Sequence, residues 1–383
     1  MLATQNGLVG DLNYYTDTQI KMRREKVKAA VNAVHSVVDP ILKYVHDKDP
    51  RFSHQTWNSG SYASGLKVTE PNEFDFNVPM EGLPNLIWKT ADKPAYYTID
   101  VDGQLVETKV PLPNPPNGYH NVTIDTVSDI WKPENNMKMG DYVVPFKVKT
   151  IFKVLVKNAV RECKLRESVR VLKKTHGPAI TLMVSSGEER ISVDLVPLVP
   201  ANGRGLPPNV LNSWPRSPVW PPKHKVEEVR KIGTDSVAKD NLYWLTSFSR
   251  CEIALLDGID SDEGCRKQCL RLLKKIREDH WQSPALSSYH LKNLLLWECE
   301  KYPNSHDWSR DMLGQRFVGL VGSLLKCLRG QNCPHYFIPS INLFRNKENS
   351  KLKEPENLLL IADKVQEFYE NPCGFIGEWK DGN

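Results

Sequence analysis

The sequence predicts an α/β chain of two halves, in which a mixed β-sheet half with a long N-terminal helix is joined to a mostly helical half. Three observations carry this prediction. Apolar residues recur at helical spacing from about residue 10 to 47, alternating patterns between 68 and 197 predict strands, and helical periods dominate after residue 225. We therefore divide the chain into a first domain of 1–225 and a second of 226–383.

The N-terminal stretch is predicted to be one long amphipathic helix. Val27, Val31, Val34 and Val38 are spaced three or four residues apart, which places them on one face of a helix. Pro40 has no amide hydrogen to donate, so it should kink or restart the helix.

Strands and one further helix follow. Residues 68–79 and 96–110 should be extended, and 112–120 should form a loop. We expect a helix over about 142–168, followed by strands at about 179–185 and 190–197.

A connector leads into the helical half. Residues 199–224 are rich in Pro, Gly and Trp and should be irregular. Beyond them, Cys269, Leu272, Leu273 and Ile276 show the spacing of a buried helix face. The charged tail after about residue 345 is expected to be partly mobile, and a cleft between the two halves is the natural place for a site.

Composition narrows the class of protein. The 383-residue chain contains no apolar run of about 18 residues and no signal-peptide pattern at its start, so we expect a cytoplasmic protein without a membrane segment. Eight cysteines without such a signal favour free thiols or a metal site over a disulfide framework.

Basic residues are concentrated on two predicted helices. The net charge of +5 is modest, but one cluster recurs at steps of four along a helix and another lies near the N-terminus. Both clusters could be ordinary solvated faces or a platform for nucleic-acid phosphates. The candidate contacts are Lys21, Arg24, Lys28, Lys149, Lys153, Lys157 and Arg161.

Three carboxylates form a candidate metal site. Glu73 and Asp75 are one residue apart on a predicted strand, so both project from one face and repel each other unless cations compensate them. Two Mg²⁺ or Mn²⁺ ions would do so. Asp194 is a lone carboxylate in an apolar strand, and the small-residue turn at Gly60 and Ser61 could cradle phosphates. Spacing alone is equally consistent with an ordinary exposed strand.

Five sequence runs resemble a known family. GSYASGLKVTEPNEFDFNV, ISVDLVPLV, GCRKQCLRLLKKI, SSYHLKNLLLWECEKYP and CPHYFIPSINLF follow one another along nearly the whole chain. Together they resemble the cyclic GMP-AMP synthase-like receptors, which belong to the male-abnormal (Mab) family of nucleotidyltransferase-fold proteins. The resemblance implies a bilobal nucleotidyltransferase fold in which Glu73, Asp75 and Asp194 bind the metals and Gly60 and Ser61 bind phosphates.

The resemblance also implies nucleotide contacts in the second half. Lys274 matches a lysine that contacts the triphosphate, Ser288 matches a phosphate contact, and Tyr289 matches a base-stacking aromatic. Without the resemblance, Tyr289 is better explained as a tyrosine at the edge of a core, beside a helix cap. The implied activity is synthesis of a cyclic dinucleotide from ATP, GTP or UTP in innate immune signalling, with dimerisation on the activating ligand.

One departure from the family concerns zinc. The vertebrate DNA-sensing member carries a His-Cys-Cys-Cys insertion, whereas the matching segment here has only Cys251, so we expect no structural zinc and favour double-stranded RNA over DNA. Cys265 with Cys269, and Cys327 with Cys333 and His335, lie close in sequence without a finger spacing, and we interpret these cysteines as buried.

Two other functions fit the same fold. A non-catalytic Mab-type scaffold or developmental protein would often lack the complete acidic set or the Gly-Ser turn, both of which this chain has. An RNA-directed nucleotide-adding enzyme would share the metal ligands but has no support from the C-terminal motifs.

Overall fold

A computed structural model describes most of the chain. The long described ranges are 2–20, 24–60, 64–68, 71–83, 142–173, 177–201, 205–345 and 354–381. The short ones are 97–99, 105–107, 118–120, 122–123, 131, 135–139 and 203. Two predicted site residues, Ser61 and Lys21, lie outside the described residues, and only the backbone of Arg24 is described.

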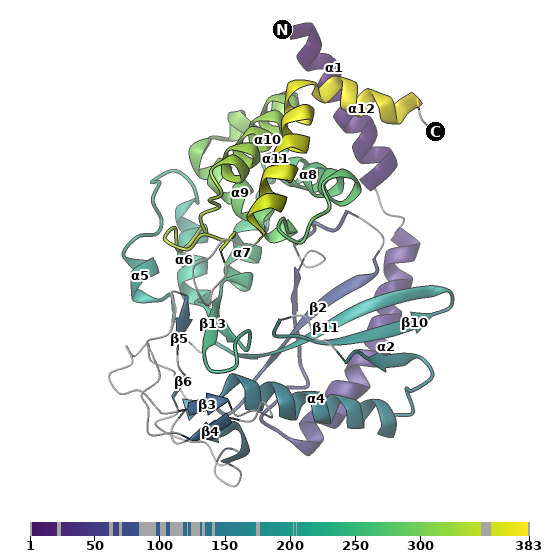
Figure 1. Ribbon diagram of the computed structural model, residues 1–383, viewed down its shortest axis with the longest axis vertical. Coiled ribbons are helices and arrows are strands. Elements are labelled where there is room, and N and C mark those ends of the chain that lie inside the picture. The colour runs from purple at the N-terminus through teal and green to yellow at the C-terminus, as the bar shows by residue number, and fades with distance from the viewer. Residues whose placement is uncertain are drawn as a thin grey trace.

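One eight-stranded sheet organises the first half (Figure 1). Its main path runs through β1 (Trp57–Ser59), β2 (Glu73–Pro79), β11 (Glu189–Val199), β12 (Asp235–Val237), β13 (Trp244–Ser247) and β5 (Tyr119–His120). β10 (Ile180–Ser186) pairs with β11 and with β9 (Val169–Val171). β2 and β11 are parallel, and the other pairs are antiparallel.

Two small sheets accompany the main one. They pair β3 (Tyr97–Ile99) with β4 (Leu105–Glu107), and β8 (Tyr142–Val143) with β6 (Val122–Thr123) and β7 (Lys138–Met139). The predicted loop at 112–120 is wrong at its end, because residues 119–120 form β5 on the edge of the main sheet.

Alternation along the two central strands fixes which face of the sheet is buried. Phe74 and Phe76 of β2, together with Val193 and Leu195 of β11, are buried in one core. The helices α2 (Arg24–Lys48) and α4 (Pro145–Glu162) pack against each other and cover this face. The intervening residues therefore point to the opposite face of the sheet.

The N-terminal helix is divided, which differs from the single helix predicted. α1 (Leu2–Tyr15) and a π-helical turn (Thr16–Ile20) precede α2, which continues through Pro40. Leu8 and Leu12 of α1 are buried in the core of the helical half, whereas Val34 and Ile41 of α2 are buried against the sheet. The two segments serve different cores, so the apolar pattern changes face between them.

The second half is helical, as predicted. A short helix, α5 (Pro208–Leu211), lies within the connector 199–224 that was expected to be irregular. The helices after it are α6 (Lys223–Ile232), α7 (Ser249–Leu256), α8 (Arg266–His280), α9 (Ser288–Lys301), α10 (Leu313–Arg329), α11 (Pro355–Glu370) and α12 (Pro372–Asp381). Short 3₁₀ turns lie at Asn135–Met137, Ser305–Trp308 and Arg310–Met312. The main sheet takes strands as far as Ser247, and the domain division at residue 225 stays a prediction.

The tail after about residue 345, which was expected to be partly mobile, contains a packed helix. α11 packs on α10, and its residues Leu358, Ile361, Val365 and Phe368 are buried. Their three- and four-residue spacing gives the helix an apolar stripe despite its charged surroundings. None of the helices in the described part of the chain is long and apolar enough to cross a membrane.

Candidate active site

The sheet register brings two of the predicted carboxylates together. Asp75 of β2 lies directly beside Asp194 of β11, and the row continues to Ser59 of β1 and Thr181 of β10. Residues paired across neighbouring strands point to the same face, so Asp75 and Asp194 share one surface. The Thr181 hydroxyl donates a hydrogen bond of 2.6 Å to Asp194 Oδ1, which fixes the orientation of that carboxylate.

Glu73 lies on the same face but has a different partner. It is two residues before Asp75, its side chain is exposed, and its Oε2 accepts a hydrogen bond of 3.2 Å from Lys67 Nζ. Among the described residues, no three His, Cys, Asp or Glu side chains are arranged as a metal site. The structure therefore pairs two of the three predicted ligands and holds the third in an ion pair.

The electrostatics of the carboxylates fit a divalent cation. Burial, together with the charges of Glu73 and Asp194, raises the pKa of Asp75 to about 6, while the charge of Lys67 opposes the rise. Carboxylate oxygens are the ligands that Mg²⁺ and Mn²⁺ prefer, and a cation would relieve this repulsion. Asp75 and Asp194 thus fit the ions as they lie, whereas Glu73 would have to exchange Lys67 for metal.

Gly60 lies directly against Asp75. Its φ of +72° is in the left-handed region, and a Cβ at this position would be 1.8 Å from Asp75 Oδ2. Only glycine avoids both the backbone strain and the collision. The Ser64 hydroxyl donates to Gly60 O at 2.9 Å, which ties Ser64 to the glycine beside the carboxylate.

A basic wall from the helical half faces the turn. Lys274 of α8 is buried and donates from Nζ to Leu66 O at 2.6 Å. Burial lowers the pKa of Lys274 to about 8, and the like charges of Lys67 and Lys292 contribute to the lowering. Lys67 and Lys292 are each in an ion pair, with Glu73 and with Glu252, so the positive charge of this wall is partly compensated.

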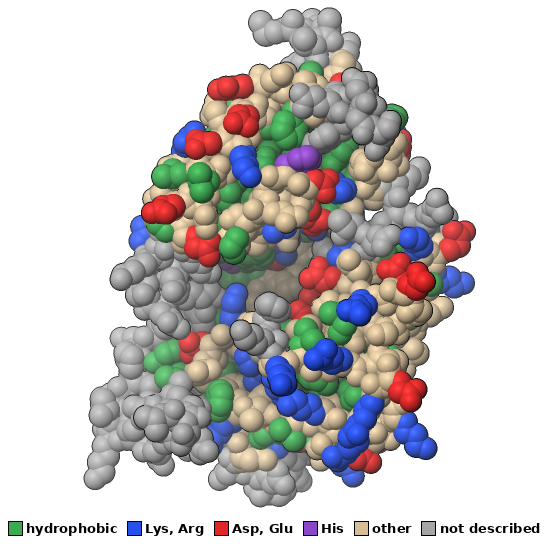
Figure 2. All heavy atoms as spheres, turned by 45° about the vertical axis from the view of Figure 1, so that its right-hand side comes forward, with side chains coloured by type: hydrophobic (Ala, Val, Ile, Leu, Met, Phe, Trp, Pro, Cys, Tyr) green, Lys and Arg blue, Asp and Glu red, His purple; other side chains and the backbone are tan. Residues whose placement is uncertain are grey.

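The first turns of α9 contribute the aromatic side of the site. Ser288 is the first residue of the helix and is half-buried. Lys292 Nζ lies 5.1 Å from the centre of the Tyr289 ring and forms an ion pair with Glu252 of α7. Tyr289 Oη lies 2.9 Å from His335 Nε2. Figure 2 shows that the surface is hollowed between the two halves, with Lys and Arg side chains gathered below the hollow.

The predicted nucleic-acid contacts divide into two groups. Lys149 and Lys153 of α4 donate to Gly177 O at 2.7 Å and Lys173 O at 2.8 Å, so they stabilise a neighbouring loop. Arg161 is exposed but forms an ion pair of 2.7 Å with the adjacent Glu162. Lys157 of α4 and Lys28 of α2 are exposed.

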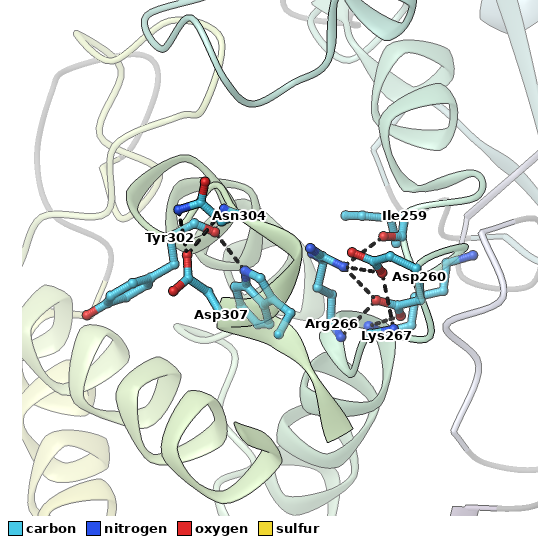
Figure 3. A network of polar contacts seen from close by, with 10 residues as sticks. Ile259, Asp260, Arg266, Lys267, Tyr302, Asn304 and Asp307 are labelled. Atoms are coloured by element: carbon cyan, nitrogen blue, oxygen red, sulfur yellow. Dashed lines mark hydrogen bonds and ion pairs between the residues drawn. The ribbon is translucent and has the colours of Figure 1, made fainter. Parts of the chain in front are cut away.

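The connection between α7 and α8 is closed by carboxylates and a guanidinium (Figure 3). Asp260 accepts from the backbone amides of Arg266 at 3.0 Å and Lys267 at 2.8 Å, which satisfies the start of α8. Arg266 Nη1 also donates to Asp262 Oδ1 at 2.8 Å. This is the segment in which the resemblance predicts no zinc.

The cysteines singled out in the sequence are free thiols. Cys265, Cys269 and Cys333 are buried as expected, whereas Cys327 is only half-buried. Cys251 is also buried. Burial raises the pKa of the Cys251 thiol, so this group is protonated and unreactive at neutral pH.

Comparison with known proteins identifies the family. The Mab-21 protein nucleotidyltransferase domain matches residues 62–258, just over half of the chain. The chain belongs to the Mab-21 family. The Mab-21 protein HhH/H2TH-like domain, which characterises the C-terminal part of such proteins, matches residues 265–359.

Two curated relatives match this chain over nearly their whole length. Protein mab-21-like 3 of Danio rerio is 28% identical over 410 residues, covering 96% of this chain and 98% of the relative. Protein mab-21-like 3 of Xenopus laevis is 29% identical over 369 residues, covering 94% and 95%. The fold of this chain is therefore that of a nucleotidyltransferase followed by a helical domain.

Sequence reasoning missed several residues that surround the site. Lys67 precedes Glu73 by six residues, and no periodicity connects the two. Thr181 is on a strand that could be predicted, but its partner Asp194 is known only from the register. Lys292 could have been found, because it follows Ser288 by four residues and so lies on the same helix face.

Proposed function

We propose that this Mab-21 family protein is a nucleotidyltransferase that joins two nucleoside triphosphates into a cyclic dinucleotide, activated by double-stranded RNA in innate immune signalling. ATP and GTP are the proposed substrates, with UTP as a third candidate. The observation that carries the proposal is the juxtaposition of Asp75 and Asp194 across parallel strands, with Gly60 against Asp75. Lys274 contacts the same loop from the opposite wall.

The acidic residues would hold the metals. Asp75 and Asp194 would bind two Mg²⁺ or Mn²⁺ ions, with Glu73 joining them after release from Lys67. When bound, such ions lower the pKa of an acceptor hydroxyl and neutralise the leaving pyrophosphate. Thr181 would keep one oxygen of Asp194 occupied, so that the carboxylate presents a fixed edge to the metal.

The basic and aromatic residues would hold the nucleotide. Lys274 and Lys292 would lie beside the triphosphate. Because burial leaves Lys274 poorly solvated, its ammonium group would gain from pairing with the phosphate charge. Lys67, once released by Glu73, would add a third cation. Tyr289 would offer a flat ring to a base, which any of the four bases can stack against.

Activation by duplex RNA is proposed to act through α2 and α4. These helices pack side by side, and Lys28 and Lys157 are exposed on them. Phosphate contacts of this kind are independent of sequence and weaken with salt. Reversing the charge at Lys28 and Lys157 should reduce RNA stimulation while the fold, measured by circular dichroism, is kept. Unchanged stimulation would remove these helices from the proposal.

A non-catalytic scaffold is the second candidate. One observation favours it: Glu73 is paired with Lys67, and the described residues contain no preformed metal site. In this reading, the acidic and basic walls neutralise each other and the cleft serves as an interface.

One experiment separates the two functions. The purified protein is incubated with all four nucleoside triphosphates and Mg²⁺ or Mn²⁺, with and without duplex RNA or duplex DNA, and products are identified by mass spectrometry. A cyclic dinucleotide that disappears in Asp194→Asn supports the synthase. Linear products alone indicate a nucleotide-adding enzyme, and no product under any of these conditions supports the scaffold.

A further inference from the structure

We propose that His335 is a positioning residue, which holds the phenol of Tyr289 by donating a hydrogen bond from a fixed Nε2–H tautomer. The inference rests on the proposed function, because only that function gives Tyr289 a base to stack on. His335 does not touch the nucleotide in this proposal and acts entirely through Tyr289.

The backbone determines the tautomer of His335. Its Nδ1 accepts hydrogen bonds from the amides of Phe337 at 3.1 Å and Ile338 at 3.2 Å. A ring nitrogen that accepts carries no hydrogen, so the neutral ring has its proton on Nε2. Nε2 lies 2.9 Å from Tyr289 Oη, and the N–H therefore donates to the phenol oxygen.

The imidazole ring is also held by packing. His335 is 7% exposed, and its ring centre is 5.2 Å from that of Phe248. Phe248 in turn stacks on Phe337 at 4.5 Å with an interplanar angle of 8°. The ring cannot turn over without breaking these contacts and both amide hydrogen bonds.

The loop that carries His335 is attached to the helix that carries Tyr289. Trp297 Nε1 of α9 donates to Pro334 O at 3.1 Å, and Asn293 Oδ1 of α9 accepts from the Tyr336 amide at 2.9 Å. These bonds flank His335 on both sides. The distance between the imidazole and the phenol is thus set by one rigid unit.

Because the phenol oxygen of Tyr289 accepts a hydrogen bond from His335, its own proton points away from His335. Burial and the charge of Glu252 raise the pKa of Tyr289 well above its usual value, and a hydrogen bond to Glu252 adds to the rise. Glu252 is 2% exposed and forms an ion pair with Lys292. Tyr289 is therefore held from two sides, which fixes the plane of the ring that a base would stack on.

Two substitutions at position 335 separate the two ring nitrogens. His335→Asn keeps an oxygen near the Nδ1 position for the backbone amides and removes the donor to Tyr289. His335→Gln places an amide donor near Nε2 and removes the acceptor for the backbone. Tyr289→Phe removes the phenol oxygen on which the donor acts.

The test measures the Kd for ATP and for GTP by fluorescence titration with Mg²⁺, in the two single variants His335→Asn and Tyr289→Phe and in the double variant. We expect both single variants to weaken binding about tenfold, from loss of ordered stacking. We expect the double variant to be no weaker than Tyr289→Phe, and His335→Gln to bind more tightly than His335→Asn. Nitrogen NMR of wild-type protein should show the proton of His335 on Nε2.

The outcomes distinguish this inference from the proposed function. Binding of ATP or GTP by wild type with unchanged affinity in His335→Asn overturns the positioning role alone, as does a proton on Nδ1. Additive losses in the double variant do the same, because the two residues would then act independently. Failure of wild type to bind either nucleotide overturns the proposed function and this inference together.

Discussion

Compared with the helical wall of the candidate site, the sheet wall is fixed by backbone rather than by side chains. Asp75 and Asp194 lie beside each other because two strands pair in register. Lys274 and Tyr289 carry longer side chains, which are placed by side-chain contacts: Lys274 by Leu66, and Tyr289 by His335 and Glu252. The sheet wall is acidic and repels itself, whereas the helical wall is basic and poorly solvated. A triphosphate with its cations would complement both walls at once.

The largest effect should come from removing a carboxylate of the sheet wall. Asp194→Asn keeps the size of the side chain but loses the charge that would bind a cation. Several kcal/mol of transition-state stabilisation would be lost, so turnover should fall about a thousandfold. Product formation by chromatography is the measurement, and Glu188→Gln on the neighbouring exposed turn is the control. Full activity in Asp194→Asn would mean that the sheet wall is not catalytic.

Gly60→Ala tests how closely the backbone at Gly60 approaches Asp75 of that wall. The new Cβ would meet Asp75 Oδ2 at 1.8 Å, so turnover should fall about a hundredfold as the carboxylate is displaced. Gly187→Ala is a matched control, because its φ of +61° imposes similar backbone strain with open space around the Cβ. If the two variants lose activity and thermal stability equally, strain alone explains the effect.

The repulsion within the sheet wall should lower the free energy of unfolding. The pKa of Asp75 rises from 3.8 to about 6 on folding, so the folded protein binds this proton more tightly and loses stability as pH rises between those values. Asp75→Asn should therefore raise the free energy of unfolding by about 3 kcal/mol well above pH 6, and by little below pH 4. Urea titrations at pH 4 and 7.5 with a chelator measure this difference. A gain that is equal at both pH values would contradict the electrostatic origin.

Thr181→Val should produce a smaller loss. The variant removes the hydroxyl that donates to Asp194 at 2.6 Å and keeps the shape of the side chain. Loss of such an outer partner should raise the Mn²⁺ concentration needed for half-maximal activity about tenfold. Thr181→Ser retains the hydroxyl and should restore most of the metal affinity. Equal metal requirements in the two variants would show that the hydrogen bond to Asp194 does not set the metal affinity.

The smallest effect concerns the helical wall and pH. The pKa of Lys274 is lowered to about 8, so nucleotide affinity in wild type should weaken about threefold between pH 7 and 9 as the charge is lost. Lys274→Met should bind more weakly at pH 7 and lack this slope. Calorimetric titration with ATP and Mg²⁺ at both pH values is the measurement. A slope that persists in Lys274→Met would assign it to another group.

The fold could be predicted from the sequence where a pattern is local. The strands expected at 179–185 and 190–197 are observed at Ile180–Ser186 and Glu189–Val199, because alternation reports directly on the pleat. The division of the N-terminal helix was missed, because the apolar residues of its two parts are buried in different cores. The packed tail was missed because its charges outweighed the apolar stripe around Leu358.

The candidate site could be predicted only in part. The Glu73 and Asp75 spacing indicated a shared face. The spacing does not show that Glu73, unlike Asp75, forms an ion pair with Lys67. Asp194 could be singled out as a charge in an apolar strand, but its neighbour Thr181 depends on the register. The positions of Lys274 and Tyr289 relative to the carboxylates depend on the packing of the helical half, which no spacing reveals.

The divided N-terminal helix has a consequence for the order in which the protein is made. α1 packs on α10 and α12, so its apolar face gains those partners only after residues 313–381 have left the ribosome. Until then Leu8 and Leu12 must remain exposed or be shielded by a chaperone. The helical half thus closes late, around a segment that was synthesised long before it, and contacts of such long sequence separation slow its folding.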